Sequence, residues 1–95
     1  MKTNAEKIVM LDTLTAELAE RLGPKISAVD YEIQDGFKCV LIRARVDGAH
    51  FVVSDTSESG IMNLLSQLDE NRISWVVAFL DKSGKVLDAL NGDKQ

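Results

Sequence analysis

The chain is poor in the residues that carry most catalytic chemistry, with one cysteine, Cys39, and one histidine, His50, among its 95 residues. A lone cysteine cannot form a disulfide within the chain, which favours a reducing, cytoplasmic location. Its longest apolar runs are about six residues, whereas a membrane-spanning helix needs about 20. The N-terminus also lacks the apolar segment of a secretory signal. The sequence therefore predicts a cytoplasmic protein with no membrane partner.

Positive charge is also scarce, because 15 acidic residues outnumber 11 Lys and Arg and leave a net charge of −4. This balance argues against binding to a nucleic-acid backbone, which needs a cationic surface. It is compatible with a basic protein partner, or with solubility alone. The length and the 45% hydrophobic content predict one globular domain over residues 1–95.

Two Asp-Gly pairs, Asp35-Gly36 and Asp47-Gly48, lie between strand-like segments. Asp-Gly is typical of two-residue type I′ turns, because both of its residues tolerate positive φ. The pairs predict a three-stranded antiparallel meander. A slip of one residue in either turn would move the apolar side chains to the other face. The apolar residues predicted to share one face are Val29, Tyr31, Ile33, Val40, Ile42, Ala44, Val46, Ala49, Phe51 and Val53.

A helix is predicted on each side of this meander. The first spans Thr3 to Leu22, with Thr3 and Glu6 spaced as a capping box and Gly23-Pro24 ending it. The second is predicted to begin within Ser54–Gly60, where Asp55 and Glu58 have capping-box spacing and Gly60 lies in the first turn. The apolar stripes expected to be buried are Ile8, Leu11, Leu14, Thr15, Leu18 and Leu22 in the first helix, with Val9 and Met10 off the stripe, and Ile61, Leu64, Leu65 and Leu68 in the second.

The C-terminal part predicts a second hairpin. Trp75–Leu80 has no polar residue and predicts a central strand, and a turn at Asp81–Gly84 leads to a last strand at Val86–Leu90. Phe79 is expected opposite Leu87, and residues 91–95 are expected to fray. The predicted fold is a two-layer α+β sandwich of order α-β-β-β-α-β-β, with a mainly antiparallel five-stranded sheet and both helices on one face. Whether the last hairpin joins the meander at its first or its third strand is left open.

The order of elements resembles two known families. Through Leu68 it resembles, in outline, a double-stranded-RNA-binding domain, a family with a lysine cluster at the start of its second helix. Here those positions read Thr56-Ser57-Glu58-Ser59, which disfavours RNA binding. With the last two strands, the order resembles small acidic chaperones of type III secretion effectors, whose further C-terminal helix has no counterpart here. Both resemblances concern the fold, and fold alone does not settle function.

The predicted register disfavours chemistry within one chain. It places His50 opposite Arg45, which lies six residues after Cys39 on the same strand, so the histidine and the cysteine are about 20 Å apart. This separation excludes a catalytic Cys-His pair and argues against a zinc site. Asp30 and Glu32 share a face with Arg43, diagonally across the hairpin from Asp30, and are interpreted as a solvated ladder of opposite charges. Ordinary helix capping, and not phosphate binding, is the favoured interpretation of Ser54–Gly60. No catalytic residue, cofactor or metal is predicted.

The face of the meander opposite its apolar side mixes apolar and charged residues, as protein interfaces do. The predicted protein-binding residues are Phe37, Leu41, Arg43, Arg45, His50 and Val52, with an extension through Val76, Ala78, Leu80, Val86 and Leu90. The expected function is a small, acidic, non-enzymatic protein-binding module, such as an adaptor, an effector-chaperone-like protein or an inhibitor of the kind that phages and mobile elements encode, acting as a homodimer. One alternative is a ligand-binding protein or enzyme with a site between subunits, formed by Arg43, Arg45, His50 or Cys39. Nucleic-acid binding is the second alternative.

Overall fold

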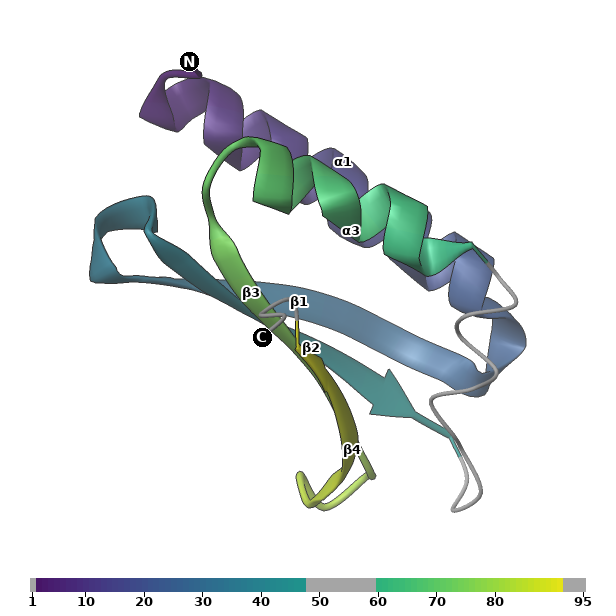
Figure 1. Cartoon of the computed structure of the whole chain (residues 1–95). Coiled ribbons are helices and arrows are strands. Elements are labelled where there is room, and N and C mark those ends of the chain that lie inside the picture. Colours follow the sequence, from purple (N-terminus) through teal and green to yellow (C-terminus); the bar gives the residue numbers. More distant parts are fainter. Residues whose placement is uncertain (1, 48–59, 92–95) are drawn as a thin grey trace.

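A computed structural model describes residues 2–47 and 60–91, which form two helices and one sheet. The helices are α1 (Asn4–Leu22) and α3 (Ile61–Glu70), and the strands are β1 (Ile26–Gln34), β2 (Cys39–Val46), β3 (Ser74–Leu80) and β4 (Val86–Asn91). Figure 1 shows both helices side by side over one face of the sheet. The predicted two-layer α+β architecture is therefore confirmed. Neither described helix is long and apolar enough to cross a membrane.

The sheet has the order β1-β2-β3-β4 and is mixed, because β2 and β3 run parallel. The described residues therefore form a mixed sheet of four strands, and they do not show the mainly antiparallel five-stranded sheet that was predicted. The physical reason for the difference is that β3 pairs with the edge of β2 that was expected to pair with the third strand of the meander. Parallel neighbours need a long crossover, and this one contains α3. The last hairpin joins β2, the middle strand of the predicted meander, and the predicted strand at Ala49–Val53 lies outside the described residues.

The connection from β1 to β2 is longer than the Asp-Gly signal predicted. Gln34 pairs with Cys39, and Asp35, Gly36 and Phe37 adopt φ values of 53°, 60° and 74°. The two-residue turn, with Gln34 opposite Phe37, is therefore wrong, and the register moves by two residues, so that Tyr31 lies opposite Ile42. An even shift leaves every side chain on its predicted face, since strand side chains alternate with a period of two.

The core lies between the helices and the covered face of the sheet. Its largest fully buried side chains include Phe79 of β3, Leu11 of α1 and Leu65 of α3. On the described strands the predicted apolar face is confirmed: its β2 residues Val40, Ile42, Ala44 and Val46 are buried, and its β1 residues Val29, Tyr31 and Ile33 pack partly buried against the core.

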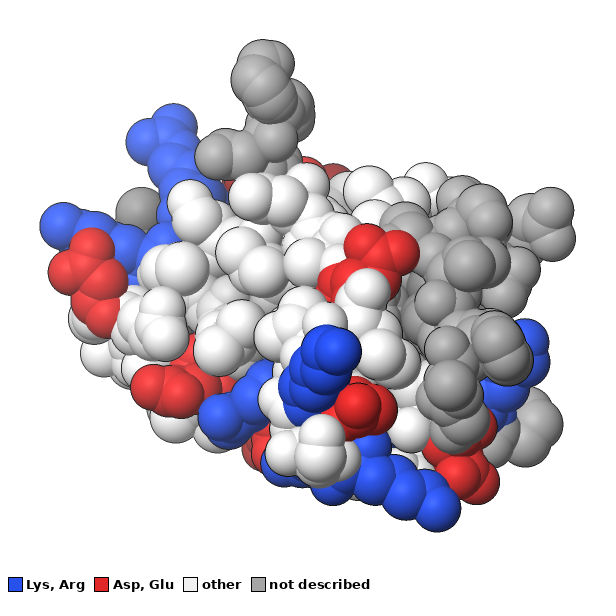
Figure 2. All heavy atoms as spheres, turned by 90° about the horizontal axis from the view of Figure 1, so that it is seen from below, with Lys and Arg blue, Asp and Glu red and all other residues white. Residues whose placement is uncertain are grey.

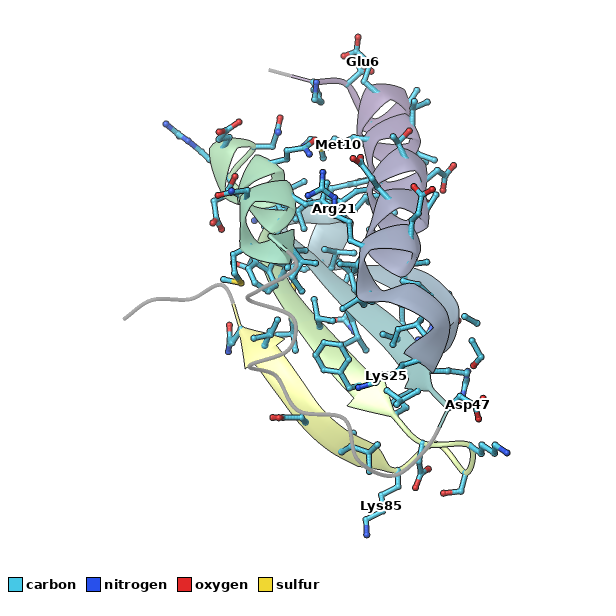
Figure 3. All side chains as sticks on the ribbon, turned by 90° about the vertical axis from the view of Figure 1, so that its right-hand side faces the viewer. Glu6, Met10, Arg21, Lys25, Asp47 and Lys85 are labelled. Carbon is cyan, nitrogen blue, oxygen red and sulfur yellow. The ribbon has the colours of Figure 1, made fainter. Side chains whose placement is uncertain are left out.

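The buried stripe of α1 is rotated relative to the prediction. Ile8 is 40% exposed, whereas Met10 is only 9% exposed. Figure 3 shows Met10 and Arg21 on the side of α1 that faces α3. The sequence pattern of one helix does not reveal which flank its neighbour covers, and here α3 covers the flank with Met10. The predicted stripe of α3 is confirmed, since Ile61, Leu64, Leu65 and Leu68 are all buried.

The predicted ends of α1 are confirmed. Glu6 N–H donates to Thr3 Oγ1 at 3.1 Å, and Thr3 N–H donates to Glu6 Oε1 at 2.8 Å, which completes the capping box. Gly23 ends α1 with a φ of 84°. In α3, Gly60 is the N-cap, with a φ of 76°, and does not lie in the first turn. The capping pair predicted there, Asp55 and Glu58, lies outside the described residues.

The pairing of β3 with β4 contains a bulge that the sequence did not predict. Phe79 lies opposite Asp88 and Leu80 opposite Val86, so Leu87 is the extra residue. The predicted pairing of Phe79 with Leu87 is therefore wrong. Leu90 packs against the core, which corrects its assignment to the uncovered face. The predicted turn at Asp81–Gly84 is confirmed: the Gly84 N–H donates to the Asp81 carbonyl oxygen at 3.0 Å, and Gly84 has a φ of 91°.

The capping box supports a stability prediction. Thr3→Ala removes the side chain that accepts from the Glu6 N–H, and should lower the free energy of unfolding by about 1 kcal/mol. Thr13→Ala, on the exposed surface of the same helix, is the matched control and should leave stability unchanged or slightly raised, because alanine favours helix. Urea denaturation followed by circular dichroism measures both. Equal losses from the two changes would contradict the assigned cap.

Candidate protein interface

The face of the sheet without helices is called the open face. It presents the strand residues that alternate with the buried ones, because successive side chains point to opposite faces. The register aligns them in rows across the strands, from β1 toward β4. The rows are Gln34, Cys39 and Ser74; Glu32, Leu41, Val76 and Asn91; Asp30, Arg43, Ala78 and Ala89; and Ala28, Arg45, Leu80 and Val86.

The half of the open face on β1 and β2 is charged. Arg43 Nε lies 2.8 Å from Asp30 Oδ1, and Arg43 Nη1 lies 3.6 Å from Glu32 Oε1. The predicted ladder of opposite charges is confirmed, with Asp30 directly opposite Arg43 and not diagonal to it. The side chains of Asp30, Glu32 and Arg43 are 57%, 52% and 34% exposed, so each pair contributes at most about 1 kcal/mol to stability. Two carboxylates share one guanidinium, which leaves this group with a net negative charge.

The half of the open face on β3 and β4 is apolar apart from Ser74 and Asn91, the two polar residues at its end. Val76 lies beside Leu41, and both are half-buried, while Val86 on β4 is 56% exposed. Ala78 and Leu80 are buried. Figure 2 shows the molecule from below, with an area of uncharged residues in white beside Lys and Arg in blue and Asp and Glu in red. Apolar contact surface and fixed charges therefore meet on one face.

The structure brings together three of the predicted protein-binding residues. Leu41, Arg43 and Arg45 alternate along β2 and point to the open face. Phe37 does not join them, because it lies in the turn and the Nζ of Lys7, on α1, is 5.7 Å from its ring centroid. His50 and Val52 lie outside the described residues. The predicted extension through Val76, Ala78, Leu80 and Val86 lies on the open face, whereas Leu90 does not.

Cys39 is half-buried at the start of β2, opposite Gln34 on one side and Ser74 on the other. It lies at the other end of β2 from Arg45. Within residues 2–47 and 60–91, no three His, Cys, Asp or Glu side chains are placed to hold a metal ion.

Away from the open face, the described residues border at least two open hollows. One, of about 380 Å³, is bordered by Lys2, Ala5, Glu6, Val9 and Met10 at the start of α1. The other, of about 360 Å³, lies where β2 and β3 end and is bordered by Val46, Asp47, Asp81, Lys82 and Ser83. Asp81 already accepts hydrogen bonds from the Ser83 hydroxyl and the Lys85 N–H, which hold its pKa below the ordinary value. Its carboxylate is thus occupied by its own turn.

A polar contact ties α1 to the edge strand β1. The Tyr31 hydroxyl donates to Asp12 Oδ1 at 2.7 Å. This hydrogen bond, together with burial and the charge of Asp12, raises the pKa of Tyr31 to about 12. Tyr31 lies on the covered face of β1, so the contact holds the helix over the outer strand.

No family model, curated protein or solved structure matches this chain.

The Tyr31–Asp12 contact predicts a pH dependence that one absorbance signal can follow, because Tyr31 is the only tyrosine of the chain. The folded-state pKa of about 12 exceeds the ordinary value of 10.0, so protonated Tyr31 stabilises the fold below pH 10, and this contribution is lost between pH 10 and 12. Tyrosinate absorbance at 295 nm should rise near pH 12 in wild type and at a lower pH in Asp12→Ala, where only burial still raises the pKa of Tyr31. Glu20→Ala, on the exposed surface of α1, should leave the midpoint unchanged. A wild-type midpoint near 10 in the folded protein would refute the contact.

Proposed function

We propose that this chain is a small protein-binding module, an adaptor, chaperone-like or inhibitor protein, that contacts its partner through the open face. The observation that carries the proposal is the arrangement of rows on that face. The two rows that begin at Asp30 and Ala28 on β1 reach only apolar residues on β3 and β4, and the row of Glu32 passes Leu41 and Val76 before it ends at Asn91. Protein interfaces combine an apolar core with a polar rim, and the open face places apolar residues beside charged ones.

The contrast between the two faces of the sheet supports this proposal. On the covered face, Val77 and Phe79 are 0% exposed beneath the helices. On the open face, Val86 is 56% exposed, and Leu41 and Val76 are only half-buried. Covering these side chains with a partner would remove apolar surface from water, at about 25 cal/mol per Å². Arg43, held in place by two carboxylates, belongs to a residue type that is enriched at binding hot spots.

The test compares two variants with the same chemical change. Val86→Glu places a charge on the open face, whereas Val9→Glu places one on the outer surface of α1, where Val9 is 64% exposed. Both baits are used beside wild type for capture from the native lysate with quantitative mass spectrometry, and for sedimentation to measure self-association. We expect one captured protein, or the second copy in a homodimer, to be depleted at least about tenfold by Val86→Glu, since a charge buried in an interface is costly. It should be retained by Val9→Glu.

Three results would contradict the proposal. The first is a strictly monomeric chain that captures nothing. The second is capture that both variants leave unchanged. The third is capture lost only with Val9→Glu, which would move the contact to α1. Thermal unfolding of each variant confirms that a loss of capture does not arise from unfolding.

A further inference from the structure

The outer strand β1 has one edge that no other described strand pairs with. Among the described residues, β1 pairs only with β2, along Ile26–Gln34. Its other edge therefore presents backbone N–H and C=O groups that can accept a further strand. At nine residues, β1 is the longest described strand, and it is long for an exposed edge.

An apolar strip runs along this edge on the helix side. Val29, Tyr31 and Ile33 face the helices but are only half-buried, whereas Val40 and Ile42 on the neighbouring strand are 1% and 0% exposed. Above them, Ile8 of α1 is 40% exposed. Ile8 lies one helical turn before Asp12, which bonds to Tyr31, so both residues lie on the flank of α1 nearest the edge. Side chains of an added strand would complete the cover over β1.

An acidic strip runs along the same edge on the open face. Asp30 and Glu32 are 57% and 52% exposed and share the single guanidinium of Arg43. Residues directly opposite one another on adjacent antiparallel strands have Cβ atoms about 5 Å apart. A lysine or arginine on an added strand would therefore reach these carboxylates from the side that Arg43 leaves open.

We infer that the β1 edge binds an extended segment of a partner protein as a further strand, and that this segment alternates apolar residues with lysine or arginine. The apolar side chains pack beneath Ile8, and the basic ones lie beside Asp30 and Glu32. Backbone hydrogen bonds supply affinity, and the two strips supply specificity, as in other cases of strand addition. A second copy fits this edge poorly, since full antiparallel overlap would place Asp30 opposite its own equivalent. The inference rests on the proposed function and names the partner's chemistry.

The experiment uses the full chain and random peptides of about ten residues displayed on phage, the length of a long strand. Enriched sequences should alternate apolar and basic residues. The strongest is synthesised, and its affinity is measured by fluorescence anisotropy. Glu32→Lys should weaken binding at least about fivefold, because it replaces attraction by repulsion. Glu20→Lys makes the same change of net charge on the outer surface of α1 and should leave binding unchanged. Amide NMR shifts should concentrate on β1.

Several outcomes would overturn the inference: no enrichment, enriched peptides without the alternation, equal weakening by both variants, or shifts on β3 and β4 in place of β1. Its failure is separable from that of the proposed function. If a captured partner is lost with Val86→Glu but kept with Glu32→Lys, the inference fails and the proposed function stands. Capture that is insensitive to both changes contradicts both.

Discussion

The parallel pairing of β2 with β3 is the constraint on which the rest of this structure depends. It places residues far apart in the sequence, such as Ile42 and Val77, side by side beneath the helices. Parallel strands cannot be joined by a tight turn, so the chain must cross over, and α3 lies within that crossover. Because the last hairpin continues from β3, its position in the sheet follows from this pairing as well. Loss of the ladder would separate the β1–β2 and β3–β4 hairpins.

The same β2–β3 pairing also determines which residues are neighbours on the open face. Leu41, Arg43 and Arg45 alternate along β2 and point to the open face. Their neighbours on that face include residues of β3. Val76 gives Leu41 an apolar neighbour, and Ala78 leaves room beside Arg43. The resulting gradient, charged toward β1 and apolar toward β4, belongs to the sheet and to no single strand.

The two edge strands of the sheet, β1 and β4, differ in length and regularity. On β4 the strand is six residues long and contains a bulge, a device that discourages further pairing. On β1 the strand is longer, and its one irregularity lies near its start, between Ile26 and Ala28. Its central residues are regular and carry an apolar strip on one side and two carboxylates on the other. The edge most suited to a further strand is therefore also the edge with the more distinctive chemistry.

Local signals in the sequence determined the two ends of α1, the positions of the turns, the apolar face of β1 and β2 and the existence of each described α-helix and strand, because these depend on neighbouring residues. Thr3 and Glu6 cap α1 as their spacing predicts, and the apolar face of β1 and β2 survives a turn of the wrong length, since side-chain alternation tolerates an even shift. The charge ladder at Arg43 follows from the same alternation. The tertiary structure alone decided that β3 lies beside β2, that α1 turns Met10 and not Ile8 into the core, and that Leu87 bulges out of the last hairpin. Each of these features depends on how segments far apart in the sequence pack together, and the pattern within one segment does not contain that information.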